Sequence, residues 1–217
     1  MSTVILESDS EYRVGKIVCV GRNYAEHISE MHAELEKEPV LFLKPATSIL
    51  NEETPIILPT YSNEIHHEVE MALLVGKKAS KIDQENWRDY IAGAGIAIDL
   101  TLRDLQKKAK EKGLPWSVSK GFDGSCPIST FVPLSKIVNP ENLRISLKLN
   151  GEIRQQSTTA KMIFPLKKLI SFISGIFTLE PGDIVLTGTP AGVSPLKSGD
   201  KIEAEIEKIG RMNFTVQ

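Results

Sequence analysis

Short apolar runs rich in β-branched residues recur along the whole chain and give the first indication of its fold. Their length and composition predict strands at Lys16 to Val20, Val69 to Val75, Gly95 to Ile98, Leu143 to Leu149, Asp183 to Leu186 and Ile202 to Ile206. Asn150-Gly151, between Leu143 to Leu149 and the run Glu152 to Gln156, suits a type I′ turn, which requires positive φ at both central positions. The pattern predicts a mainly β chain with at least one antiparallel hairpin.

Helical patterns are fewer. The clearest covers Leu102 to Lys112, where Thr101 and Asp104 resemble a capping box. A second covers roughly Pro165 to Ser174, and a third, with sparse apolar positions and a loop as its alternative, covers Tyr24 to His32. Antiparallel hairpins with segregated helices, and no regular alternation of strand and helix, predict an α+β fold.

Composition narrows the picture to one compact domain, residues 1–217. A chain of 217 residues with 41% hydrophobic content can bury a sizeable core, and its formal net charge of -2 offers no basic face for nucleic acid or lipid. The apolar run Val4 to Leu6 is too short for a signal peptide or a membrane span. Cys19 and Cys126 lie in no C-x-x-C spacing. We therefore expect no nucleic acid or membrane partner, reduced thiols and a cytoplasmic location.

Three acidic residues stand at strand ends in positions that favour a shared ligand. Glu68 and Glu70 lie two apart at the start of a predicted strand, so both side chains point to one face. Asp99 ends the apolar run Ile96 to Ile98, at a strand-to-helix junction. Three hard oxygen ligands favour magnesium or manganese over zinc. The alternative, on spacing alone, is a solvated strand face followed by a turn cap.

Two other motifs carry less weight. His66 and His67 could suggest zinc, but neighbours on a strand face opposite ways and the H-E-x-x-H spacing is missing. Gly93-Ala94-Gly95 begins like a dinucleotide fingerprint, but Ile98 holds the third glycine position. We expect neither a zinc site nor a dinucleotide site.

His27 and Glu30 are acid–base candidates. They are three residues apart, so on a helical turn they share a face, where the carboxylate can orient the imidazole and raise its basicity. Such a pair can activate water. The alternative is two polar residues on an exposed helix, since Glu26, His32 and Glu34 lie nearby.

A further set of polar residues could hold an anionic substrate. Arg103 and Gln106 share a helical face, and Lys120 follows the strand-like segment Ser117 to Ser119. Thr189 follows a glycine that would let main-chain amides and a hydroxyl approach a carboxylate closely. Taken singly, residues such as Arg103, Gln106 and Lys120 are more often surface residues, and an ordinary turn is the alternative for the segment with Thr189.

Together these motifs resemble the fumarylacetoacetate hydrolase family, in its short acylpyruvase and oxaloacetate decarboxylase branch. The resemblance spans nearly the whole chain, and the ordered set is more specific than any piece of it. The matching stretches are Val20-Gly21-Arg22-Asn23-Tyr24-Ala25-Glu26-His27, Phe42-Leu43-Lys44-Pro45, His66-His67-Glu68-Val69-Glu70, Ile98-Asp99-Leu100-Thr101-Leu102-Arg103-Asp104 and Leu186-Thr187-Gly188-Thr189-Pro190.

The resemblance implies a mixed β-roll fold, a homodimer or higher assembly, and a role for each candidate residue. The metal ligands, for Mg²⁺ or Mn²⁺, would be Glu68, Glu70 and Asp99. The catalytic groups would be His27 with Glu30, on a lid that orders over the substrate, and Lys120 beside the reacting oxo group. The substrate would be positioned by Arg22, Arg103 and Gln106, and its carboxylate would meet Thr189.

The implied reaction is metal-dependent cleavage of acylpyruvates, 2,4-dioxo acids such as acetylpyruvate or fumarylpyruvate, to release pyruvate. Decarboxylation or tautomerisation of oxaloacetate could use the same site, because all three reactions need a stabilised enolate. One alternative is an isomerase or hydratase of unsaturated 2-oxo acids in aromatic catabolism, although the His27–Glu30 pair points away from it. The other is a protein that binds small 2-oxo acids without turning them over.

Overall fold

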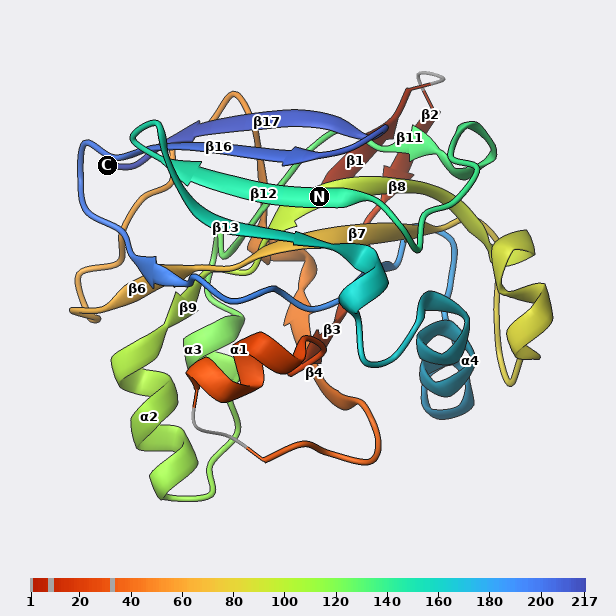
Figure 1. Cartoon of the computed structure of the whole chain (residues 1–217), viewed down its shortest axis with the longest axis horizontal. Helices are drawn as coiled ribbons and strands as arrows, with labels where there is room; N and C mark the ends of the chain where they lie inside the picture. Colours follow the sequence, from red (N-terminus) through yellow and green to blue (C-terminus); the bar gives the residue numbers. More distant parts are fainter. Residues whose placement is uncertain (1, 8–9, 32–33) are drawn as a thin grey trace.

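The structure, a computed structural model, describes residues 2–7, 10–31 and 34–217 and is built mainly of β-strands (Figure 1). Its largest sheet mixes parallel pairs, β3 with β14 and β5 with β10, with antiparallel pairs. A further strand, β11 (Val132–Pro133), pairs with β8 off the main path. The strand order is β4 (Val40–Pro45), β3 (Lys16–Gly21), β14 (Ile184–Leu186), β7 (Val69–Val75), β8 (Ile91–Ile98), β10 (Cys126–Ile128) and β5 (Ile49–Asn51).

A second sheet has four antiparallel strands in the order β13 (Glu152–Thr158), β12 (Arg144–Leu149), β16 (Lys201–Ile206) and β17 (Gly210–Thr215). The predicted hairpin joins β12 to β13, with φ of 55° at Asn150 and 84° at Gly151, and this confirms the turn read from the sequence. Two smaller sheets complete the β structure. They are β1 (Thr3–Leu6) with β2 (Ser10–Arg13), and β15 (Ser194–Pro195), β6 (Ile65–His67) and β9 (Thr101–Leu102).

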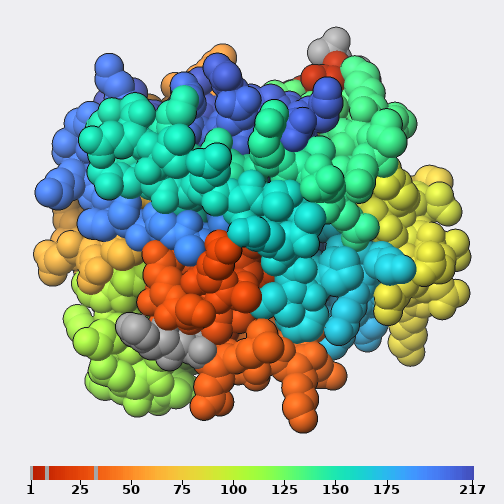
Figure 2. All heavy atoms as spheres, in the orientation of Figure 1, coloured from red at the N-terminus to blue at the C-terminus, as the bar shows by residue number. Residues whose placement is uncertain are grey.

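The helices are short. They are α1 (Ala25–Glu30), α2 (Arg103–Glu111), α3 (Ser117–Lys120) and α4 (Leu166–Ile176), with 3₁₀ turns η1 (Ala46–Ser48), η2 (Gln84–Tyr90), η3 (Leu134–Lys136) and η4 (Thr159–Lys161). Figure 1 places α1, α2 and α3 together beside one end of the sheets, and Figure 2 shows α1 in the middle of one face, flanked by α2 and the segment with η4. Helix α1 confirms the helix predicted near Tyr24. The last position of the predicted range, residue 32, lies outside the described residues.

Two local predictions were wrong. Ser117 to Ser119 forms a helix and not a strand, because the main-chain N–H groups of Ser119 and Lys120 both donate to Trp116 O. The expected capping box at Thr101 is absent in the described structure: Thr101 pairs with His66 in a small sheet. The Asp104 carboxylate does not bond to Thr101. It accepts hydrogen bonds from Ser62 Oγ and from the main-chain N–H groups of Asn63 and Leu105.

Strands β7 and β8 are buried on both faces, which explains their nearly continuous apolar sequence. Along β7, Met71 packs into the cluster shared with the four-stranded sheet, whereas Ala72 packs into a second cluster on the opposite face. Because side chains alternate along a strand, Glu68 and Glu70 share the face of Ala72. The large sheet therefore carries two glutamates at one end of an otherwise apolar layer.

Among the helices of the described residues, none has the length and apolar character needed to cross a membrane.

Candidate metal centre and active site

Three carboxylates meet at one end of the large sheet. Glu68 immediately precedes β7, Glu70 lies within it, and Asp99 follows the paired strand β8. The Asp99 N–H donates to Glu68 O at 2.8 Å, and one carboxylate oxygen of each residue lies within 4.8 Å of the others. All three side chains are buried. The predicted convergence of Glu68, Glu70 and Asp99 is therefore present in the structure.

Two buried lysines face these carboxylates in different ways. Lys120 Nζ donates to Glu68 Oε2 at 2.8 Å and to Asp99 Oδ2 at 2.6 Å. Lys44 Nζ lies 2.9 Å from Asp99 Oδ1, but its N–H bonds are directed to the Lys120 and Ser125 carbonyl oxygens and to Ser125 Oγ. Asp99 Oδ1 is thus buried without a hydrogen-bond donor in the described chain. Lys44 is held by groups that are not candidate ligands, whereas both of these Lys120 hydrogen bonds go to candidate ligands.

The electrostatic balance differs among the carboxylates. Burial alone would raise the pKa of Glu68, but the Lys120 ammonium and the Arg103 guanidinium hold that pKa well below its usual range. Burial, followed by the charges of Asp99 and Glu68, raises the pKa of Glu70 well above its usual range. Glu70 accepts a hydrogen bond from Gly188 N at 2.6 Å, which offsets part of that cost.

These observations fit a divalent cation. The three residues offer hard oxygen donors, one oxygen of Asp99 lacks a hydrogen-bond donor, and the ionised form of Glu70 is disfavoured without further positive charge nearby. Oxygen donors of this kind suit Mg²⁺ or Mn²⁺. His67, considered above for zinc, lies elsewhere: its Nδ1 is 3.0 Å from Gln155 Oε1 and its Nε2 is 2.8 Å from Ser194 Oγ.

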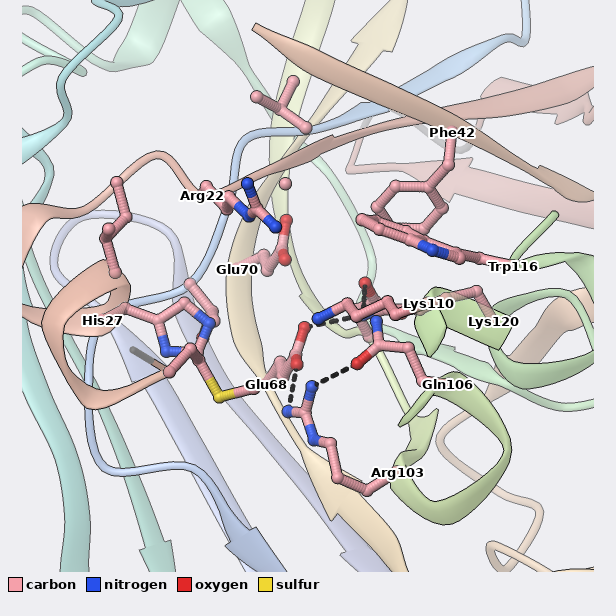
Figure 3. A pocket seen from close by; sticks show the side chains of 16 residues that line it. Arg22, His27, Phe42, Glu68, Glu70, Arg103, Gln106, Lys110, Trp116 and Lys120 are labelled. Atoms are coloured by element: carbon pink, nitrogen blue, oxygen red, sulfur yellow. Dashed lines mark hydrogen bonds and ion pairs between the residues drawn. The ribbon is translucent and has the colours of Figure 1, made fainter. Parts of the chain in front are cut away.

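His27 faces the carboxylates from α1. Its side chain is buried, lines the same pocket as Glu68 and Glu70, and places Nδ1 3.1 Å from Glu30 Oε2 (Figure 3). Glu30 Oε1 accepts from Gly192 N at 3.0 Å, so the carboxylate itself is fixed. With Nδ1 bonded to Glu30, Nε2 is the ring nitrogen able to exchange a proton with a bound molecule. Burial and this contact disfavour the exposed-helix alternative.

The predicted substrate-positioning residues Arg22, Arg103 and Gln106 all line this pocket. Arg103 pairs with Glu68 through Nη2 and donates from Nη1 to Gln106 Oε1 at 2.9 Å, so these two side chains form one unit with a metal-ligand candidate. Arg22 has a φ of 60°, in the left-handed region, and its Nη1 lies 3.1 Å from Glu36 Oε1 at the surface. Residues held at such angles cluster at functional sites.

Thr189 also lines the pocket, but its hydroxyl is committed to the protein. Its Oγ1 donates to Val69 O and accepts from Gln155 Nε2, both at 2.8 Å. The preceding Gly188 has a φ of 95°, and an added Cβ would lie 2.6 Å from Asn23 Cβ, so only glycine fits there. If Thr189 meets a substrate carboxylate, its main-chain N–H is therefore a better donor than its hydroxyl.

The sequence reasoning missed two buried residues that organise this site. Lys44 lies in the stretch Phe42-Leu43-Lys44-Pro45, which supports the family resemblance but does not by itself indicate a role for this lysine. Gln155, on β13, accepts from Val69 N at 3.1 Å through Oε1 and bridges to Thr189 through Nε2. For Lys44, the presence of a lysine within an apolar strand could have indicated a buried, functional side chain. For Gln155, no local sequence feature indicates the role, because its partner Val69 is 86 positions away in the chain.

Comparison with known proteins adds the family context. The model of the fumarylacetoacetate (FAA) hydrolase C-terminal family matches residues 16–217. The chain is 50% identical over 201 residues to the mouse protein named oxaloacetate tautomerase FAHD1, mitochondrial, covering 93% of this chain and 91% of the mouse protein. A crystal structure of fumarylpyruvate hydrolase from Pseudomonas aeruginosa in complex with Mn²⁺ and pyruvate superposes with a TM-score of 0.94 at 34% identity, over 99% of this chain and 94% of that one.

A structure of 5-carboxymethyl-2-hydroxymuconate delta-isomerase from Mycobacterium smegmatis is also similar, with a TM-score of 0.85 at 34% identity. It covers 94% of this chain and 79% of the isomerase chain. Proteins with different named activities therefore share this fold.

Proposed function

The chain belongs to the fumarylacetoacetate hydrolase family, and we propose that it is a divalent-metal-dependent enzyme that interconverts the enol and keto forms of small 2-oxo acids, oxaloacetate above all. The observation that carries the proposal is the cluster of Glu68, Glu70 and Asp99, with Lys120 against it and His27 across the pocket. The mouse oxaloacetate tautomerase, similar over most of both chains, supports the choice of reaction.

Keto–enol exchange moves one proton between C3 and the C2 oxygen of a 2-oxo acid and passes through an enolate. A divalent ion held by Glu68, Glu70 and Asp99 would supply Lewis-acid stabilisation of the enolate charge, worth several kcal/mol. Lys120, already between two of these carboxylates, adds positive charge beside the C2 oxygen. From enol to keto, the C2 hydroxyl would lose its proton to water while His27, oriented by Glu30, delivers a proton to C3. From keto to enol, His27 would take the proton from C3 and the C2 oxygen would gain one from water.

A second activity, hydrolysis of acylpyruvates, is favoured by the His27–Glu30 contact. Removing a proton from water at His27 Nε2 would let the oxygen attack the distal carbonyl carbon. The bond from that carbon to C3 then breaks, and the electron pair leaves as pyruvate enolate, which is protonated to pyruvate. The Pseudomonas fumarylpyruvate hydrolase, at 34% identity, supports this activity. Decarboxylation of oxaloacetate would also end in pyruvate enolate, without the attacking water.

A panel assay separates these activities from the alternatives. Oxaloacetate, acetylpyruvate, fumarylpyruvate and an unsaturated 2-oxo acid without a 4-oxo group would each be offered with magnesium, with manganese and with EDTA. The proposal expects metal-dependent turnover, fastest for oxaloacetate tautomerisation. Turnover of an unsaturated 2-oxo acid alone would favour the isomerase alternative, and binding of pyruvate without turnover of any substrate would favour a non-catalytic binding protein.

The oligomeric state, the compartment and the partners of the protein remain predictions. We propose a homodimer in a reducing, cytoplasmic compartment, acting on a small 2-oxo acid without nucleic acid or membrane partners. Both cysteines are buried and free, which fits reduced thiols.

A further inference from the structure

Four cationic side chains of lysine or arginine surround the pocket, and they differ in what neutralises them. Among the described residues, Lys120 pairs with Glu68 and Asp99, Arg103 pairs with Glu68, and Arg22 pairs with Glu36 at the surface. The fourth cation, Lys110, pairs with no carboxylate of the described chain. Its Nζ lies instead 5.3 Å from the ring centroid of Trp116.

The position of Lys110 follows from helix geometry. Arg103, Gln106 and Lys110 are spaced three and four residues apart along α2, so they share one face of the helix, and all three line the pocket. Figure 3 shows Lys110 with Gln106 and Trp116 on the side of the glutamates opposite His27. The Lys110 side chain is exposed, whereas Glu68, Glu70 and Asp99 are buried at the floor. Lys110 therefore stands at the mouth.

The environment of Lys110 is electrostatically unfavourable in a way that an anion would relieve. Partial burial, then the charges of Arg103, Arg22 and Lys120, lower its pKa. Arg22 reaches the same mouth from the loop before α1, and its only ion pair within the described residues is with the half-exposed Glu36. Two cations that repel each other are thus held at one opening, with little protein charge to offset them.

We propose that Lys110 and Arg22 form the subsite that receives the second carboxylate of a 2-oxo dicarboxylic acid such as oxaloacetate, and that they favour this acid over the same compound with an uncharged distal end. This inference rests on the proposed function, which places the 2-oxo acid end of the substrate at the buried carboxylate cluster. The distal end then extends toward the mouth, where Lys110 and Arg22 meet its negative charge. Arg103 and Lys120 are less suited to that role because both are already paired with Glu68.

The test compares oxaloacetate with its 4-methyl ester, which keeps the 2-oxo acid end and loses the distal charge. Enol-to-keto conversion of both would be followed by enol absorbance with magnesium, in the wild type and in Lys110→Gln, Arg22→Gln and Lys108→Gln. Lys108 is exposed on the same helix and outside the pocket, so Lys108→Gln is the matched control. The measured quantity is the ratio of kcat/KM for oxaloacetate to kcat/KM for the ester.

We expect Lys110→Gln and Arg22→Gln each to lower this ratio by about 10-fold, as suits the loss of one charge-assisted contact, and Lys108→Gln to leave it unchanged. An unchanged ratio in both pocket variants would overturn the subsite. So would a wild type that converts acid and ester equally well. If the wild type converts neither compound, it is the proposed function that fails, and the panel assay shows this separately.

Discussion

Replacing Lys44 by methionine tests whether a buried ammonium holds the acidic cluster together. The side chain of Lys44 is wholly buried, and its Nζ contacts Asp99 Oδ1, Ser125 Oγ and the carbonyl oxygens of Lys120 and Ser125. Methionine has a similar length but neither charge nor donors. The change removes one of the two lysines beside Asp99. It also removes the Nζ donor from the buried carbonyl oxygens of Lys120 and Ser125.

The magnitude follows from burial. Removing one partner of a buried ion pair costs about 3–5 kcal/mol, because the remaining charge stays buried without compensation. We therefore expect Lys44→Met to lower the free energy of unfolding by about that amount. Lys148→Met is the matched control: Lys148 Nζ lies 2.8 Å from Glu203 Oε1, a separation close to that of Lys44 from Asp99, but both side chains are more than a third exposed. Water screens that pair, so its loss should matter little.

The assay is urea denaturation of wild type and both variants in EDTA, monitored by tryptophan fluorescence. A second series with saturating magnesium should recover part of the loss in Lys44→Met, because a cation bound to the cluster replaces some of the missing charge. Equal changes in the free energy of unfolding for Lys44→Met and Lys148→Met would show that the buried ammonium of Lys44 does not stabilise the acidic cluster.

Three further predictions follow from the same contacts. His27→Ala should lower the rate of acetylpyruvate hydrolysis by about 10²- to 10⁴-fold and the rate of oxaloacetate decarboxylation by less, with little change in metal affinity. Steady-state kinetics would measure both rates, and unchanged hydrolysis at saturating magnesium would remove His27 from the mechanism. Gln155→Leu should cost about 2–4 kcal/mol in urea denaturation, because Val69 N and Thr189 Oγ1 lose their buried partner, and a cost near zero would show that the network is not needed. Thiol titration of the protein unfolded without reductant should find both Cys19 and Cys126 free, and a titration that detects neither would contradict the expected reducing compartment.

The sequence predicted the elements whose pattern is local. The strand at Val69 to Val75 matches its predicted bounds, the turn at Asn150-Gly151 has positive φ at both positions, and the two-residue spacing of Glu68 and Glu70 placed both on one face. The family resemblance added expected roles for residues whose spacing alone left their function open, and those roles stay predictions.

What the sequence did not reveal depends on contacts between distant segments. Thr101 and Asp104 have the sequence of a capping box. In the structure, however, Thr101 pairs with His66 in a small sheet and the Asp104 carboxylate accepts a hydrogen bond from Ser62. The helix Ser117–Lys120 is too short for its periodicity to be visible. The contact from Lys44 to Asp99 and the contacts of Gln155 arise only when separate strands are brought together by the fold.

Metal titration of oxaloacetate tautomerisation would show directly whether Glu68, Glu70 and Asp99 hold a divalent ion that is needed for reaction on 2-oxo acids. Enzyme stripped with EDTA would be titrated with magnesium while the enol absorbance is followed, in the wild type, in Glu70→Gln and in Glu64→Gln. Glu64 is exposed, and among the described side chains its carboxylate pairs with His66 alone. If they do, we expect the stripped wild type to be inactive and magnesium to restore its activity. Glu64→Gln should behave as the wild type does, and Glu70→Gln should need far more magnesium or stay inactive. Full activity in the stripped enzyme, or the same titration curve for Glu70→Gln and Glu64→Gln, would contradict a metal site at these carboxylates.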